Sequence, residues 1–128
     1  MSHAIRLLLA AALAAAAGSA WSDSAWADGD AARGEKKFEE CQACHSLDRN
    51  AESVGPSLYG VFERKAGSGT DFRYSPAMKR SGLTWDEASL RAYITDPQGQ
   101  VKGNRMPFAG IKQPSDADDV VAYLKTLN

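Results

Sequence analysis

Apolar positions recur with the 3.6-residue period of a helix in three stretches, separated by long irregular segments. The first stretch runs from about Asp30, which can cap a helix, to Gln42. Its apolar face carries Ala31, Gly34, Phe38 and Cys41. Glycine in a helix interior costs about 1 kcal/mol relative to alanine, unless another backbone must pass close by. We therefore expect a second helix to cross this one at Gly34.

The C-terminal segment is the expected crossing helix. It should begin at Ser115, because Ser115 and Asp118 have the spacing of a capping box. Its apolar stripe consists of Val120, Val121, Leu124 and Leu127. The pattern predicts that the first and last helices pack against each other.

A third helix is predicted to open in Thr84-Trp85-Asp86-Glu87, which also fits a capping box, and to end at Asp96-Pro97. Residues 99–113 read as irregular, and so does the long segment from His45 to Thr84, apart from a helical turn at about 75–80. A loop of this length needs a bound group on which its apolar residues can pack. Because strand patterns are nearly absent, the predicted class is all-α with long loops.

The first 27 residues have the pattern of a cleaved secretory signal peptide. Arg6 precedes an apolar run over residues 7–17 that is too short to cross a bilayer, and small residues follow up to Ala25-Trp26-Ala27. An earlier cut near Gly18 and an uncleaved anchor are the alternatives. We expect export to the periplasm, a single domain over residues 28–128 and no stable membrane insertion after cleavage.

Charge argues against a nucleic-acid or lipid partner. The chain has 15 Lys and Arg and 16 Asp and Glu residues, and loss of Arg6 and Asp23 with the signal peptide leaves 14 and 15. This balance offers no positive excess to a polyanion. The remaining 101 residues form one small domain that is marginal on apolar burial alone.

The candidate chemistry lies in Cys41-Gln42-Ala43-Cys44-His45, which holds both cysteines of the chain and its only histidine besides His3. Two thiols at this spacing can add across the two vinyl groups of a haem, and the next residue can then ligate the iron. A zinc site would lack its fourth ligand, a thioredoxin-like pair would need a βαβ unit, and a plain disulfide would leave His45 without a role. Covalent haem attachment explains all three residues.

An electron carrier benefits from an iron that is six-coordinate in both oxidation states. No other histidine follows the signal peptide, so the candidates for the sixth ligand are the thioethers of Met78 and Met106. Pro107 stiffens the loop beside Met106 and favours that residue, while Met78 stays open as an alternative.

The chain resembles the class I cytochromes c, in the group of mitochondrial cytochrome c and bacterial cytochrome c2. The resemblance covers almost all of residues 30–127. Its motifs, in order, are Gly34 and Phe38, Cys41-x-x-Cys44-His45, Gly55-Pro56-x-Leu58, Arg64-Lys65, Phe72-x-Tyr74, Gly82-Leu83-Thr84-Trp85, Tyr93, Met106-x-Phe108-Ala109-Gly110-Ile111 and Ala122-Tyr123-Leu124-Lys125.

The resemblance implies the cytochrome c fold and one haem c, held by thioether links to Cys41 and Cys44. It implies His45 and Met106 as the iron ligands and the Pro56 carbonyl as the acceptor for the second imidazole nitrogen. It also implies that Tyr74 and Trp85 bond a haem propionate with Arg64 nearby, and that Tyr93 lies close to the Met106 sulfur.

Three positions depart from the family's common pattern. Met78 stands where asparagine is common, Tyr59 where mitochondrial members have histidine, and Asn104 where threonine is common. Met78 should alter the hydrogen bonding beneath the haem, and with it the potential and the stability of the Met106 bond.

The resulting hypothesis is a soluble, monomeric, periplasmic carrier of single electrons, and not an enzyme, because no catalytic constellation is visible. Its partners would be a membrane cytochrome complex, an oxidase, a reaction centre or a dehydrogenase. Docking is expected to use Lys36, Lys102, Arg105 and Lys112. The alternatives are a haem subunit of a larger dehydrogenase complex, and a haem enzyme or sensor with an open iron position.

Overall fold

The fold is described by a computed structural model over residues 28–49, 51 and 53–127; the predicted signal peptide lies outside these residues. The elements are α1 (Ala31–Phe38), the 3-10 turn η1 (Cys41–Ala43), α2 (Pro76–Arg80), α3 (Glu87–Thr95), α4 (Pro97–Gln100) and α5 (Pro114–Leu124). The only β pairing within the described ranges is an isolated bridge between Lys65 and Thr84. The predicted all-α class is confirmed.

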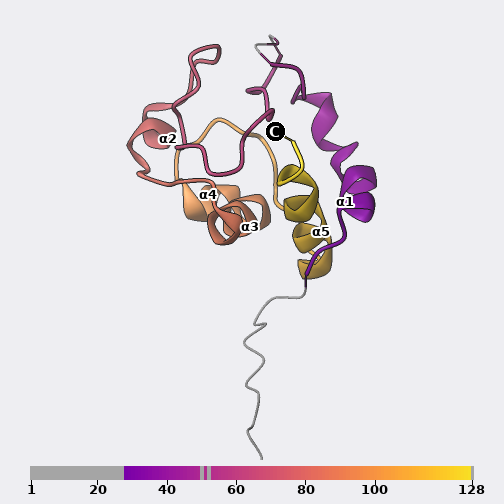
Figure 1. Ribbon diagram of the computed structural model, residues 1–128. Coiled ribbons are helices and arrows are strands. Elements are labelled where there is room, and N and C mark those ends of the chain that lie inside the picture. The colour runs from indigo at the N-terminus through magenta and orange to yellow at the C-terminus, as the bar shows by residue number, and fades with distance from the viewer. Residues whose placement is uncertain (1–27, 50, 52, 128) are drawn as a thin grey trace, which may run out of the picture.

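Helices α1 and α5 pack directly on each other, and Figure 1 shows them side by side on one flank of the molecule. At their crossing, a Cβ on Gly34 would lie 1.9 Å from the Asp119 carbonyl oxygen, so only glycine lets the backbones approach this closely. The crossing expected at Gly34 is confirmed. An ion pair also connects α1 and α5: the Arg33 guanidinium donates through Nε and Nη2 to the Asp119 carboxylate at 2.7 and 2.8 Å.

Helix α1 begins as predicted but ends early. The Asp30 carboxylate accepts from the Arg33 amide at 2.8 Å, which caps the first turn. The helix stops at Phe38, not at Gln42, and the chain tightens into η1. There the Cys41 carbonyl accepts from the amides of both Cys44 and His45, at 3.1 and 2.9 Å. The candidate motif thus forms a compact turn.

Both predicted capping boxes were wrong, although both helices exist. Helix α5 begins at Pro114, one residue before Ser115, and its N-cap has no side-chain bond; proline suits this position because its fixed φ is already helical. Helix α3 begins at Glu87 and is capped by the Asp86 carboxylate, which accepts from the Ser89 amide at 2.8 Å. In α3 a residue nearer to the helix took the capping role predicted for Thr84, whereas in α5 no side chain fills that role.

The shorter elements lie between these helices. Helix α2 matches the predicted turn and is capped by the Ser75 hydroxyl, which accepts from the Met78 amide at 3.0 Å. Helix α4 was not predicted, since its four residues carry no period; Pro97 at its start and the bond from the Gly99 amide to the Asp96 carboxylate form it. Figure 1 shows α2, α3 and α4 on the flank away from α1, with loops connecting the two flanks.

A small apolar core links the two flanks. Its buried members include Phe38 from α1, Leu90 and Tyr93 from α3, and Val120 and Leu124 from α5. A larger set of apolar side chains is only half-buried around this core: Cys41, Leu47, Leu58, Phe62, Tyr74, Ala77, Leu83, Ile94, Met106, Ile111, Tyr123 and Leu127. Within the described ranges, no helix has the length and apolar character needed to cross a membrane.

Candidate haem site

His45 is held by a single backbone acceptor. Its Nδ1 lies 2.7 Å from the Pro56 carbonyl oxygen. A carbonyl only accepts, so this contact assigns the proton of the neutral ring to Nδ1 and leaves the Nε2 lone pair available to a metal. Burial lowers the pKa of His45, and the bond to Pro56 opposes this only in part. At neutral pH the ring is therefore in the form that ligates iron.

The two cysteines are chemically available. Cys41 and Cys44 are both half-buried and neither forms a disulfide. Burial raises the pKa of the Cys41 thiol, with smaller contributions from Glu40 and Cys44. Two free thiols and one neutral imidazole on a single tight turn fit the group that the motif predicts, covalently attached haem.

Gly55 shapes the position of the imidazole. A Cβ on this residue would lie 2.7 Å from His45 Cε1 and 2.9 Å from Nδ1. The Gly55 amide donates to the Cys44 carbonyl at 2.7 Å, and the Ser53 hydroxyl donates to the same oxygen at 2.8 Å. The loop after His45 therefore folds back on the cysteine motif. Sequence reasoning placed a turn here but missed that the glycine makes room for the ring.

Met106 is positioned by Asn104. The Asn104 side-chain oxygen accepts from the Met106 amide at 2.8 Å, while its Nδ2 donates to the carbonyls of Pro97 and Val101 at 2.9 and 3.0 Å. Asn104 itself is buried, with 8% of its surface exposed. It therefore ties the Met106 backbone to helix α4. Sequence analysis noted Asn104 only as a departure from the family pattern. Its role was missed because its hydrogen-bond partners lie in and beside α4, which was not predicted.

The segment after Met106 is fastened to helix α3. The Ile111 amide donates to the Ile94 carbonyl at 2.8 Å. A Cβ on Gly110 would lie 1.9 Å from the Thr95 carbonyl oxygen, and Gly110 has a φ of +93°. Met106 is thus held on both sides of its position in the chain. Its side chain is half-buried, whereas the alternative ligand Met78 lies inside the apolar core with 7% of its surface exposed.

The four remaining predicted contact residues lie on connected segments. Arg64 donates to the carbonyls of Ser57 and Tyr59, each at 3.1 Å, and its own carbonyl accepts from the Trp85 amide at 2.9 Å. The rings of Trp85 and Tyr93 are tilted by 54° with centroids 5.0 Å apart. The structure therefore brings Arg64, Trp85 and Tyr93 together.

Two phenols in this region keep their protons. Burial raises the pKa of Tyr93 to about 12. Burial also raises the pKa of Tyr74, an effect that the nearby Arg64 charge opposes and Asp71 reinforces. Both tyrosines can therefore donate a hydrogen bond at neutral pH.

The hydrogen bonds from Arg64 to backbone carbonyls were not predicted, because a guanidinium with carbonyl partners has no sequence signal.

The zinc alternative gains no support from the described residues. They contain no group of three His, Cys, Asp and Glu side chains that could hold a metal ion. The thioredoxin-like alternative also lacks its context, since the motif follows a short helix and the described residues form no parallel sheet.

Comparison with known proteins gives the family directly. The family model "Cytochrome c" matches residues 31–128. Cytochrome c2 iso-2 of Magnetospirillum fulvum is 51% identical over 90 residues, which are 70% of this chain and 94% of that protein. Cytochrome c2 of Rhodoblastus acidophilus is 50% identical over 96 residues, covering 74% of this chain and 90% of that protein.

A solved structure agrees with these relatives. Cytochrome cH from Methylobacterium extorquens superposes with a TM-score of 0.73 at 49% sequence identity, over 77% of this chain and 99% of that one. The likeness in three dimensions therefore supports the same family as the likeness in sequence.

Proposed function

This chain belongs to the cytochrome c family, and from that membership we propose that it is a periplasmic carrier of single electrons. It would hold one haem c through Cys41 and Cys44, with His45 and Met106 as iron ligands. The observation that carries the proposal is the Cys41–His45 turn, in which Nδ1 of the imidazole is bonded to the Pro56 carbonyl at 2.7 Å. That bond leaves Nε2 as the metal ligand and fixes the ring.

When bound, haem c supplies an iron that accepts or releases one electron. The residues of this chain control the surroundings of that iron. Pro56 and Gly55 fix the imidazole, and the Asn104 bonds to α4 fix the backbone of Met106. Both proposed ligands are thus held by hydrogen bonds to neighbouring residues, so little would have to move during electron transfer.

The relatives support a carrier rather than an enzyme, because the names they carry are those of cytochromes c2 and cH. We propose that the electron donors and acceptors are redox proteins: a membrane cytochrome complex, an oxidase, a reaction centre or a dehydrogenase. Encounters of this kind are brief and use small interfaces.

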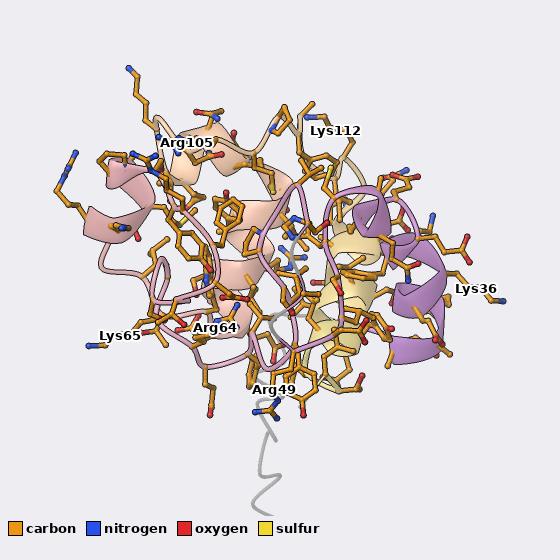
Figure 2. All side chains as sticks on the ribbon, turned by 90° about the horizontal axis from the view of Figure 1, so that it is seen from above. Lys36, Arg49, Arg64, Lys65, Arg105 and Lys112 are labelled. Carbon is orange, nitrogen blue, oxygen red and sulfur yellow. The ribbon has the colours of Figure 1, made fainter. Side chains whose placement is uncertain are left out.

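Docking would use exposed cations that the protein does not pair internally. Lys36, Lys102, Arg105 and Lys112 are exposed and form no ion pair within the described residues, in contrast to Arg33 and Lys37. Figure 2 shows Arg105 and Lys112 along one edge of the molecule and Lys36 farther round, on α1. Transfer rates with a physiological partner should fall as ionic strength rises. Rates that do not change with salt would contradict this docking model.

The ligand assignment can be tested with two matched methionine variants of the haem-loaded protein. Met106→Ala should abolish the weak long-wavelength absorption of ferric iron bound to a thioether, lower the midpoint potential and open the iron to carbon monoxide. Met78→Ala removes the same side chain from the core and should keep the band while lowering stability by about 2–4 kcal/mol. Loss of the band in Met78→Ala alone would overturn the assignment. Rapid carbon monoxide binding by the unaltered protein would favour an open-site haem protein instead.

A further inference from the structure

A surface pocket of about 420 Å³ lies beside α2. It is lined by Arg73, Tyr74, Pro76, Lys79, Arg80 and Arg105. Four of these six residues are cations, and no acidic residue lines the pocket. The volume far exceeds the roughly 10–15 Å³ that one water molecule needs on the same measure, and it is large enough for a small polyatomic ion.

These four cations have no carboxylate partner within the described part of the chain. The ion pairs found there use Arg33, Lys37, Arg91 and Lys125. The one bond from a pocket cation goes to a neutral group: Arg105 Nη1 donates to the Arg73 carbonyl at 3.3 Å. Although the chain as a whole is nearly neutral, with a formal charge of −1, this pocket is strongly positive. Like charges gathered without counterions repel each other, and an anion would relieve that repulsion.

We propose that this pocket binds a small multivalent phosphate anion, of which pyrophosphate is the simplest example. Three guanidinium groups favour phosphate because their planar forks can donate two parallel hydrogen bonds to its oxygens. The Lys79 ammonium adds a point charge beside these guanidinium groups. All four cations are exposed, so the anion can enter from solvent.

Occupancy would act on the segment that carries Met106. Arg73, Lys79 and Arg80 belong to α2 and its approach, while Arg105 comes from the loop after α4. The segments already touch, since a Cβ on Gly103 would lie 3.5 Å from Ala77 Cβ and Arg105 bonds to the Arg73 carbonyl. An anion bound by both segments would hold α2 and the loop after α4 together. Arg105 directly precedes Met106, so the anion would also restrain the backbone at Met106. This clamp does not depend on electron transfer.

The test uses the haem-loaded protein, so that any carboxylate of the cofactor is in place. Pyrophosphate binding is measured by isothermal titration at about 100 mM ionic strength, where surface charges are screened beyond about 10 Å, and thermal unfolding is followed with and without the anion. Lys79→Gln/Arg80→Gln should weaken binding at least about tenfold and remove most of the anion-induced rise in Tm. The matched control Lys36→Gln/Lys65→Gln removes the same charge from exposed residues that do not line the pocket, and it should change binding less than about twofold. Figure 2 shows both lysines well apart from Arg105.

Three outcomes would overturn the proposal. The first is no heat of binding and no rise in Tm with pyrophosphate. The second is equal weakening in the pocket variant and the control, which would mean attraction to overall charge. The third is binding to vesicles containing anionic phospholipid but not to pyrophosphate, which would make the surface a membrane contact. None of these results depends on redox activity, so failure here leaves the carrier function standing.

Discussion

Gly55 controls the position of the His45 ring from outside the cysteine motif. Its backbone φ is not positive, so the glycine is required by space and not by conformation. In Gly55→Ala, the new methyl group would overlap His45 Cε1 and Nδ1, at 2.7 and 2.9 Å, and push the ring away from the Pro56 carbonyl. We expect a loss of about 1–3 kcal/mol in unfolding free energy, as for overpacked sites, together with a shifted haem spectrum and midpoint potential.

Gly60→Ala is the control for this prediction. Gly60 has a φ of +58°, and no atom lies within 4 Å of the place that a Cβ would occupy, so alanine there meets backbone strain but no neighbour. It should cost about 1–2 kcal/mol without altering the spectrum. If Gly55→Ala shows the same unaltered spectrum, the glycine does not position the imidazole.

Single residues differ in how far the sequence reveals them. Cys41, Cys44 and His45 could be predicted as haem-binding residues because their chemistry depends on spacing within one short segment. The role of Asn104 could not, because its acceptors are backbone carbonyls in and beside a four-residue helix without periodicity. A motif within one short segment can be recognised from the sequence, whereas hydrogen bonds to backbone carbonyls of another segment can be identified only from the structure.

At the scale of elements, the α1–α5 crossing depends on one small residue. Gly34→Ala should gain about 1 kcal/mol of stability from helix propensity. It should lose more than that to steric overlap, because the new Cβ would fall 1.9 Å from the Asp119 carbonyl oxygen. Since neither backbone can yield without moving its helix, we expect a net loss of about 2 kcal/mol or more, measured by urea unfolding. Ala32→Gly, on the exposed side of α1, should cost only about 1 kcal/mol. A Gly34→Ala protein as stable as the parent would show that the helices cross elsewhere.

The same crossing should give the protein an acid-sensitive contact. Asp119 accepts from the Asp30 amide at 2.7 Å and from two nitrogens of Arg33. The Arg33 bond, aided by the Asp30 amide, lowers the pKa of Asp119. The folded state therefore resists protonation of Asp119 more than the unfolded state does. The contact stabilises the fold fully above pH ~4, the ordinary range of an aspartate, and is lost as pH falls through the lowered pKa.

Asp119→Asn should thus lower the unfolding free energy by about 1–3 kcal/mol at pH 7 and flatten its decline below pH ~4. Urea unfolding at a series of pH values measures both effects. Asp48→Asn, at an exposed side chain with no partner among the described residues, should leave the curve unchanged. A parallel decline in Asp119→Asn and the parent would exclude this carboxylate as the source.

Helix existence was easier to predict than helix boundaries, for a physical reason. Apolar periodicity reports burial along the whole element, and it located α1, α3 and α5. The position of a cap depends on which of several adjacent polar side chains reaches the first free amides of the helix. In α3 that side chain is Asp86 and not Thr84. Helix α5 begins with Pro114 and has no side-chain cap.

At the scale of the whole molecule, the sequence says least about what holds the long loops in place. Some are fixed by the chain itself, as when Arg64 binds the carbonyls of Ser57 and Tyr59. Yet many apolar side chains on them stay half-buried around a small core, among them Leu58, Phe62 and Met106. A domain of this size has little apolar burial to spare. We therefore expect the fold to gain much of its stability from a group packed against those side chains.

Cys41→Ser/Cys44→Ser should accordingly uncouple this domain from its cofactor and unfold it. Serine keeps the size and the turn-forming backbone of each position but cannot form a thioether, so the protein should be isolated without covalent haem, as mass spectrometry would show. Thermal unfolding followed by circular dichroism should lose its cooperative transition, because the half-buried residues have nothing to pack on. Val54→Ser, at an exposed side chain in the nearby loop, should keep both haem and cooperativity. A double variant that is colourless and still melts cooperatively would show that the chain alone completes its core, and that the loops are organised by their own hydrogen bonds.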